Sequence, residues 1–175
     1  DTIDLYKPCR MDNSVPVEDI IGTVADLIKE GKVRYLGVSE ITSEQLRKAH
    51  SAYPVSALEI GYSLADRQIE SDLLPVAKEL GIGVVAFANT AEGLLTGDMK
   101  APLAANDYHG HFSRFQGDNL VKNLEKVDVL KQMAKDKGHT PTQLAIAWVN
   151  AQGKHIMPLV SMSRRLRLPE NTAAM

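Results

Sequence analysis

Two kinds of hydrophobic pattern alternate along the chain. Short, largely apolar runs are typical of strands, and they lie at residues 3–6, 33–38, 55–62, 83–88 and 155–160. Between them, apolar residues recur every three or four positions, which predicts helices over residues 17–31, 42–49, 68–81, 119–138, 140–153 and 165–175. The pattern therefore predicts strands and helices in alternating order.

Two of these helices begin with a recognisable capping sequence. Thr42 and Gln45 stand three residues apart, as do Thr140 and Gln143, which is the spacing of a capping box. Pro141 occupies the first helical position of the later helix, where its fixed φ suits the helix start. Both boundaries are therefore expected near these residues.

The order of elements favours an α/β fold with a parallel sheet. Strands that are apolar throughout and separated by helices usually lie in a sheet whose outside is covered by those helices. A doubly wound sheet and a (β/α) barrel both fit this order. Residues 97–118 form the one long irregular stretch, which we expect to be an active-site lid or partly disordered.

Composition excludes several classes of protein. The 175 residues are 44% hydrophobic, which suffices for a single globular domain, and 20 Lys and Arg nearly balance 22 Asp and Glu. We therefore expect no strong attraction to nucleic acid or to a membrane surface. The apolar runs are far shorter than the roughly 20 residues that span a bilayer. A single cysteine excludes an intrachain disulfide framework, and with no secretory signal in these residues we expect a cytoplasmic protein.

Several segments, in the order in which they occur, resemble the aldo-keto reductase family. They are DTIDLY (1–6), EGKVRYLGVSE (30–40), GYSLADRQIE (61–70), ELGIGVVAFA (79–88), GLLTG (93–97), RFQGDN (114–119), TPTQLAIAWVNAQG (140–153) and SRRLRLPEN (163–171). The resemblance implies an NADP(H)-dependent carbonyl reductase on a (β/α)8 TIM barrel. It further implies that residues 1–175 are one partial barrel domain, truncated at both ends, with strands four to eight.

A partial barrel of this kind has a physical consequence. Five of eight strands leave two open edges and an uncovered apolar interior, which promotes aggregation. We expect either a missing N-terminal segment or self-association to close the barrel. By the resemblance, the catalytic Asp, Tyr and Lys come from strands that precede this chain.

The resemblance places Cys9, after the first strand, where the family usually has a histidine that orients the substrate carbonyl. A thiol with an ordinary pKa of about 8.5 is mostly neutral at pH 7 and donates hydrogen bonds more weakly than imidazole. Arg10 beside it would lower that pKa. Three interpretations stay open: a small residue that fills space, a thiol that lines the site, and a nucleophile.

The next two strand ends resemble the family's contacts to the nicotinamide carboxamide. Ser39 matches the pattern, whereas Glu40 replaces an amide and Glu59 replaces a glutamine. A carboxylate cannot donate the hydrogen bonds that an amide donates. An acid buried beside a cofactor would need a charged partner or a raised pKa. The alternative is that both glutamates are solvated loop acids.

The fourth strand end keeps part of the family pattern for the cofactor. Phe87 retains the ring that stacks on nicotinamide, and Gly93 and Leu94 return to the pattern after residues 88–92 depart from it. Glu92 stands where the family has an arginine that faces the pyrophosphate. This exchange replaces attraction with repulsion, opposite to what an anion site requires.

The last segment matches the family better. By the resemblance, Ser163, Arg164 and Arg167 contact an adenosine 2′-phosphate, and Glu170 with Asn171 hydrogen-bonds adenine. The fork of an arginine suits phosphate, so the segment favours NADP over NAD. The alternative is a charged helix start without a ligand.

Three functions follow from these features. The first is NADPH-dependent reduction of an aldehyde or ketone to an alcohol by hydride transfer. The second is a regulatory or nucleotide-binding module on the same fold with weakened or absent turnover, which Cys9, Glu59 and Glu92 favour. The third is an inert fragment that does not fold alone.

His109 and His111 form an HxH pair without a third ligand nearby, so no metal site is expected.

Overall fold

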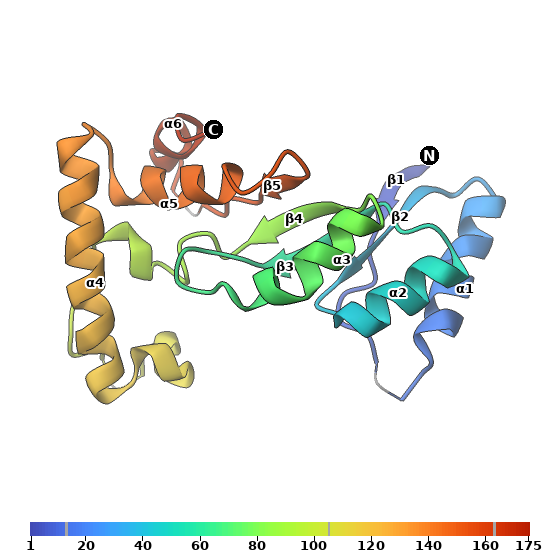
Figure 1. Cartoon of the computed structure of the whole chain (residues 1–175), viewed down its shortest axis with the longest axis horizontal. Coiled ribbons are helices and arrows are strands. Elements are labelled where there is room, and N and C mark those ends of the chain that lie inside the picture. Colours follow the sequence, from blue (N-terminus) through green and yellow to red (C-terminus); the bar gives the residue numbers. More distant parts are fainter. Residues whose placement is uncertain (13, 105, 163) are drawn as a thin grey trace.

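The computed structural model of the chain describes residues 1–12, 14–104, 106–162 and 164–175. This part of the chain forms one sheet of five parallel strands in the order in which they occur in the sequence (Figure 1). The strands are β1 (Ile3–Tyr6), β2 (Val33–Ser39), β3 (Ala57–Gly61), β4 (Gly83–Phe87) and β5 (Ile156–Pro158). The predicted α/β class is therefore confirmed.

Helices connect successive strands. They are α1 (Val17–Lys29), α2 (Ser43–Ala52), α3 (Leu73–Glu79), α4 (Gly117–Asp136), α5 (Pro141–Asn150) and α6 (Arg167–Thr172). Both predicted capping boxes are present, with the side chains of Thr42 and Thr140 accepting from the backbone N–H groups of Gln45 and Gln143. The helix starts were thus predictable from local sequence.

The helix predicted over residues 68–81 is divided in the structure. A 3₁₀ helix (Gln68–Ser71) precedes α3, and Asp72 between them has a non-helical φ of −143°. Pro75 is the third residue of α3, within the first turn, where its missing N–H group needs no helical partner. The division thus places Pro75 where an α-helix tolerates it.

The two faces of the sheet differ in how they are covered. Helices α1, α2 and α3 lie along one face (Figure 1), where Leu36, Leu58 and Val84 are fully buried in the main hydrophobic cluster. In each strand, the residues directly before and after these buried ones point to the opposite face. Apolar side chains on that face stay exposed, with Tyr35 59% and Met157 66% accessible. The open apolar face expected of a partial barrel is therefore present.

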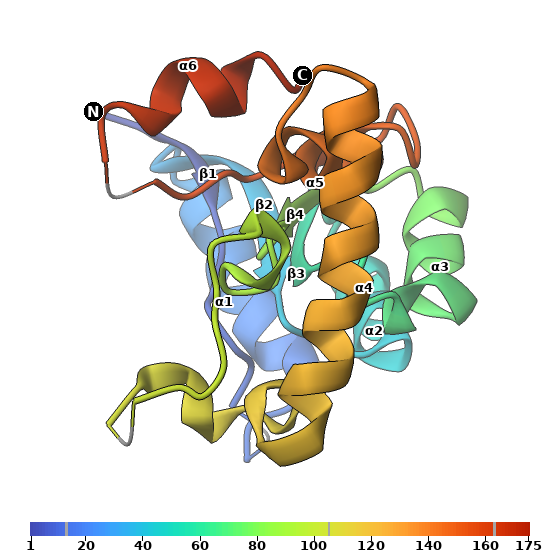
Figure 2. The same cartoon turned by 90° about the vertical axis from the view of Figure 1, so that its left-hand side faces the viewer.

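A second hydrophobic cluster packs against α4, the long helix that stands in front of the sheet in Figure 2. Its buried members come from the segment after β4, from α4 and from α5, and they include Leu94, Leu95, Phe115, Leu120, Val127 and Ala145. The stretch 97–118 is therefore not wholly irregular. It contains the 3₁₀ helices Tyr108–His111 and Ser113–Phe115, and buried Phe115 fixes its end against α4.

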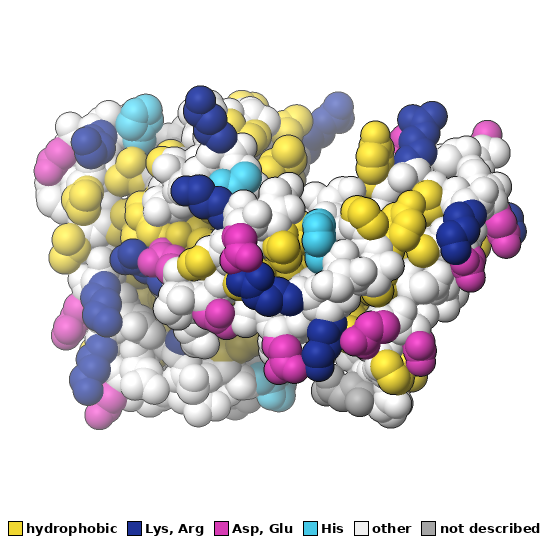
Figure 3. Space-filling view, turned by 45° about the vertical axis from the view of Figure 1, so that its right-hand side comes forward, with side chains coloured by type: hydrophobic (Ala, Val, Ile, Leu, Met, Phe, Trp, Pro, Cys, Tyr) yellow, Lys and Arg dark blue, Asp and Glu magenta, His cyan; other side chains and the backbone are white. Residues whose placement is uncertain are grey.

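Charges of both signs are mixed over the surface. On the face shown in Figure 3, Lys and Arg side chains lie among Asp and Glu side chains, with hydrophobic groups between them. In the described residues, no helix is both long and apolar enough to cross a membrane.

Candidate functional site

The carboxyl ends of the strands carry unusual backbone geometry. Among the described residues, the non-glycine positions with positive φ are Arg10, Glu40, Ala88, Ala91 and Glu92, with φ between 50° and 54°. All of them lie shortly after the ends of β1, β2 or β4. Such conformations cost energy and cluster at functional sites, so this edge is the first candidate for function.

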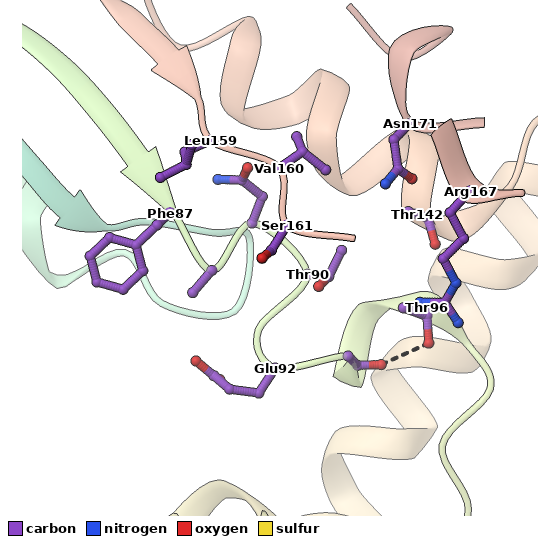
Figure 4. Close-up of a pocket in the computed structure, with 13 residues that line it drawn as sticks. Phe87, Thr90, Glu92, Thr96, Thr142, Leu159, Val160, Ser161, Arg167 and Asn171 are labelled. Carbon is purple, nitrogen blue, oxygen red and sulfur yellow. Dashed lines mark hydrogen bonds between the residues drawn. The ribbon is translucent and has the colours of Figure 1, made fainter. Parts of the chain in front are cut away.

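A groove with a volume of about 380 Å³ opens at this edge. Its walls come from residues between Phe87 and Thr96, from Leu159 to Ser161 directly after β5, from Arg167 and Asn171 of α6, and from Thr142 of α5. Figure 4 shows Phe87 at one end of the groove and Arg167 at the other. An elongated groove with a ring at one end and a cation at the other suits a nucleotide.

The residues predicted to bind adenosine phosphate differ in placement. Asn171 is 3% exposed and lines the groove, and its Oδ1 has no hydrogen-bond partner among the described residues. Arg167 also lines the groove, and its Nη2 lies 3.9 Å from an exposed Asp98 oxygen. A buried unpartnered acceptor and a weakly paired guanidinium fit an adenine amino group and a phosphate, respectively.

Other predicted residues lie around that groove. Glu170 accepts a hydrogen bond from the Thr140 hydroxyl at 2.7 Å, so its carboxylate joins α6 to the start of α5. Gly93 lines the groove with φ 89°, whereas Leu94, 3% exposed, is buried in the second hydrophobic cluster and its side chain does not line the groove. Arg164 is exposed, and Ser163 lies outside the described residues.

Glu92 lines the groove, and its carboxylate is paired with Arg114. Its Oε2 lies 3.4 Å from Nη1 of Arg114, and Nη2 of Arg114 donates to Asp66 at 3.2 Å. The Glu92 carbonyl also lies 2.8 Å from Nε2 of His109. The acid that departs from the family pattern therefore anchors the segment of residues 107–115.

His109 itself has acceptors at both ring nitrogens. Nδ1 lies 2.6 Å from the Asp107 carboxylate, and Nε2 faces the Glu92 carbonyl. The hydrogen bond to Asp107 raises the pKa of His109 above its ordinary 6.5. Partial burial of the ring acts in the opposite direction but is the smaller effect. In the described residues, no group of three or more His, Cys, Asp or Glu side chains is placed to hold a metal ion.

Ser39 and Glu59 lie side by side on the open face of the sheet. The register pairs Ser39 with Glu59 and Glu59 with Val85, two residues before Phe87. Ser39 is 5% exposed, and Glu59 forms an ion pair with Lys7. Glu59 is thus a strand residue with a charged partner, not a loop acid in solvent.

Sequence reasoning did not single out Lys7, although a signal was available. Every second residue of a strand points to the same face. Lys7 follows β1 two residues after Leu5, so it points to the same face as Ile3 and Leu5. Cys9, further along, is an exposed free thiol. The structure thus adds a cation at the end of β1 that the prediction lacked.

A second cavity, of about 470 Å³, adjoins the groove. Both share Phe87, Ala88 and Glu92 in their walls. Tyr108 and Phe112 add aromatic surface to the second cavity, with ring centroids 5.3 Å apart. Two adjoining cavities that meet at an aromatic ring can hold two reactants face to face.

Comparison with known proteins identifies the family. The family described as "Aldo/keto reductase family" matches this chain over residues 1–175, its whole length. The chain belongs to the aldo/keto reductase family. Its five parallel strands and their helices match the barrels of solved aldo-keto reductases over about half of those barrels.

Individual relatives agree with this assignment. The chain is 39% identical to the aldo-keto reductase str7 of Strobilurus tenacellus, covering 99% of this chain and 53% of that protein. It is 37% identical to the probable aldo-keto reductase 1 of Glycine max, over 99% of this chain and 50% of that protein. The glycerol dehydrogenase AKR11B4 of Gluconobacter oxydans superposes with a TM-score of 0.84 at 30% identity, covering 90% of this chain and 49% of that one. The chain spans about half the length of the curated relatives it matches.

Proposed function

We propose that this chain supplies the cofactor groove and part of the substrate cavity of an NADP(H)-dependent reductase that converts an aldehyde or ketone to an alcohol. The observation that carries the proposal is the meeting of two cavities at Phe87, on the strand edge where the strained backbone lies. Family membership supports a carbonyl substrate and a nicotinamide cofactor.

NADPH, when bound, supplies the hydride. Phe87 would stack on the nicotinamide ring, with Ser39 and Glu59 on the neighbouring strands beside it. The backbone around Gly93 and Leu94 would face the pyrophosphate. The 2′-phosphate would lie against Arg164, Arg167 and Ser163, and adenine against Asn171 and Glu170. These side chains would bind and orient the cofactor, so they would set its affinity and the preference for NADPH.

The carbonyl substrate would occupy the cavity of about 470 Å³. Tyr62 lines that cavity, but it is 1% exposed and its hydroxyl donates to Glu70 at 2.7 Å. Burial, followed by that hydrogen bond to Glu70, raises the pKa of Tyr62, so its proton is held and Tyr62 is a poor general acid. Cys9 would lie near the reacting carbonyl as a weak hydrogen-bond donor.

The proton donor would therefore come from residues outside this chain. We infer that further barrel strands cover the open face of the sheet, because apolar side chains are exposed there and the chain spans about half of its relatives. Those strands would carry the general acid of the family. Self-association of this chain is the alternative closure.

A second function is favoured by Glu92. A carboxylate in the groove wall repels a pyrophosphate, so a nucleotide-binding or regulatory module with little turnover fits this observation. Both functions are tested by one comparison in the protein at its full encoded length. NADPH consumption with a panel of aldehydes and ketones supports the reductase, and saturable NADPH binding without consumption supports the module. Absence of both would refute the cofactor groove.

A further inference from the structure

Lys7 reaches across one strand to pair with an acid on the next. It follows β1, its aliphatic stem lies over Gly37 of β2, and its ammonium forms an ion pair with Glu59 of β3. A Cβ at Gly37 would collide with the Lys7 stem, so the missing side chain makes room for this crossing. The sequence thus provides both the pair and the space that it needs.

The pair is neither solvated nor deeply buried. The side chain of Lys7 is 25% exposed and that of Glu59 is 23% exposed. The ion pair gives each charged group a partner of opposite sign. It also leaves each partner with unused hydrogen-bonding capacity, because an ammonium has three donors and a carboxylate has about four acceptor positions.

The position of the pair in the sheet indicates which group of a ligand could use these free donors and acceptors. Glu59 is level with Ser39 and Val85, and Phe87 is the next residue of β4 on the same face. A donor and an acceptor therefore stand next to each other on the face of the sheet that carries Phe87, whose ring lies over Gly61, two residues beyond Glu59. A primary carboxamide offers the complementary arrangement, an accepting C=O beside a donating NH₂.

We propose that Lys7 is a cofactor-positioning residue and that Lys7 and Glu59 together read the carboxamide of the nicotinamide. Lys7 donates to the carboxamide oxygen, and Glu59 accepts from its amino group. The ion pair then performs the role that one neutral amide side chain would perform. This inference rests on the function proposed above and adds to it a residue and a recognition mode.

The test uses the protein at its full encoded length and two probes, NADP⁺ and its 3-acetylpyridine analogue. The analogue keeps the carbonyl group and replaces NH₂ by CH₃, so it retains the Lys7 contact and loses the Glu59 contact. Dissociation constants are measured by fluorescence titration for wild type, Lys7→Met, Glu59→Gln and the double variant. Lys29→Met, which removes an exposed ion pair with Asp26, is the matched control.

The expected results follow from the donors and acceptors that each variant retains. Wild type binds NADP⁺ more tightly than the analogue, and Lys7→Met weakens binding of both by about tenfold. The double variant regains most of the NADP⁺ affinity, because the amide that Glu59→Gln introduces offers both a donor and an acceptor by itself. Lys7→Arg retains affinity, because it keeps the charge and the donors.

Other results would overturn the inference in distinguishable ways. If wild type binds neither probe, the proposed function fails, and the inference fails with it. If wild type binds NADP⁺ and Lys7→Met binds it as tightly as Lys29→Met does, only the inference is wrong. A pair that merely stabilises the sheet would give equal dissociation constants for all folded variants while the melting temperature changes. If Lys7→Met does not fold, the double variant with Glu59→Gln, which carries neither charge, is the test. The inference is refuted if this variant binds NADP⁺ much more weakly than wild type does.

Discussion

Arg114 holds Glu92 by an ion pair across the boundary of the two cavities, with Nη1 3.4 Å from Oε2. The same guanidinium donates to Asp66, so one arginine is shared between two carboxylates. Glu92 Oε2 is buried and makes no hydrogen bond among the described residues. Oε2 thus has one long ion pair and no hydrogen bond, and a bound anion beside this carboxylate would be repelled.

Glu92→Gln is predicted to tighten NADPH binding about three- to tenfold at low ionic strength, because it removes a negative charge from the groove and frees Arg114. Fluorescence titration at two salt concentrations measures this, and the gain should shrink as salt rises. Glu44→Gln, on exposed α2, is the control and should leave affinity unchanged. Unchanged or weaker binding by Glu92→Gln would show that the carboxylate does not oppose the cofactor.

The contact between His109 and Asp107 makes the segment 107–115 sensitive to pH. The pKa of His109 is raised by the hydrogen bond to Asp107, so its contribution to folding is complete below pH 6.5 and is lost as pH rises through the folded-state pKa. The pKa of Asp107 is lowered, first by the backbone N–H of His109, so its contribution is lost only in acid below 3.8. The anchored segment is therefore most stable between these two limits.

A proton NMR titration of the imidazole checks this pH dependence. The His109 resonance should titrate above pH 6.5, and Asp107→Asn should move it downward. His109→Gln assigns the signal, because it removes that imidazole from among the five histidines of the chain. Titration of His109 at or below its ordinary value in the unaltered protein would contradict the geometry.

The same substitution at two glycines should have opposite effects on stability. Gly37→Ala is predicted to lower the free energy of unfolding by about 1–3 kcal/mol, because the new methyl group meets the Lys7 stem and the Ala57 carbonyl oxygen at 3.2 Å. Gly22→Ala, inside α1 with no atom within 4 Å of the new Cβ, should raise it by about 0.5–1 kcal/mol. Urea denaturation measures both. Equal effects would show that Lys7 does not lie over Gly37.

Two capping threonines provide a second matched comparison. Thr42→Ala should cost about 1 kcal/mol of unfolding free energy, because it removes one N-cap. Thr140→Ala should cost about 1 kcal/mol more, because its hydroxyl also donates to Glu170 and joins α6 to α5. Denaturation curves of both variants decide, and equal costs would mean that the Glu170 contact contributes nothing.

Features that depend on neighbouring residues were predictable from the sequence. The capping boxes at Thr42 and Thr140 are local patterns of hydroxyl and amide, and both occur in the structure. The apolar runs, which are also local patterns, predicted the strands of the parallel sheet, although all four residues of β1 are exposed. The division of the predicted helix at Asp72 was missed, because periodicity alone does not distinguish a 3₁₀ turn that precedes an α-helix.

Features that depend on distant partners were not predictable. The sequence indicates that a buried Glu59 needs a charged partner, but Lys7 lies 52 residues away, and only the strand order brings them together. The shape of the segment 107–115 likewise depends on contacts of His109 and Arg114 with Glu92, and on the burial of Phe115 beneath α4. No local pattern encodes these contacts.

Binding of NADP(H) in the groove between Phe87 and Arg167 is the proposal on which the others depend. Its most direct test is the dissociation constant of NADPH and of NADH for the protein at its full encoded length, with and without Arg167→Ala. We predict saturable binding with at least about tenfold preference for NADPH, and loss of that preference in Arg167→Ala. No saturable binding of either cofactor, or a preference that survives the substitution, would contradict it.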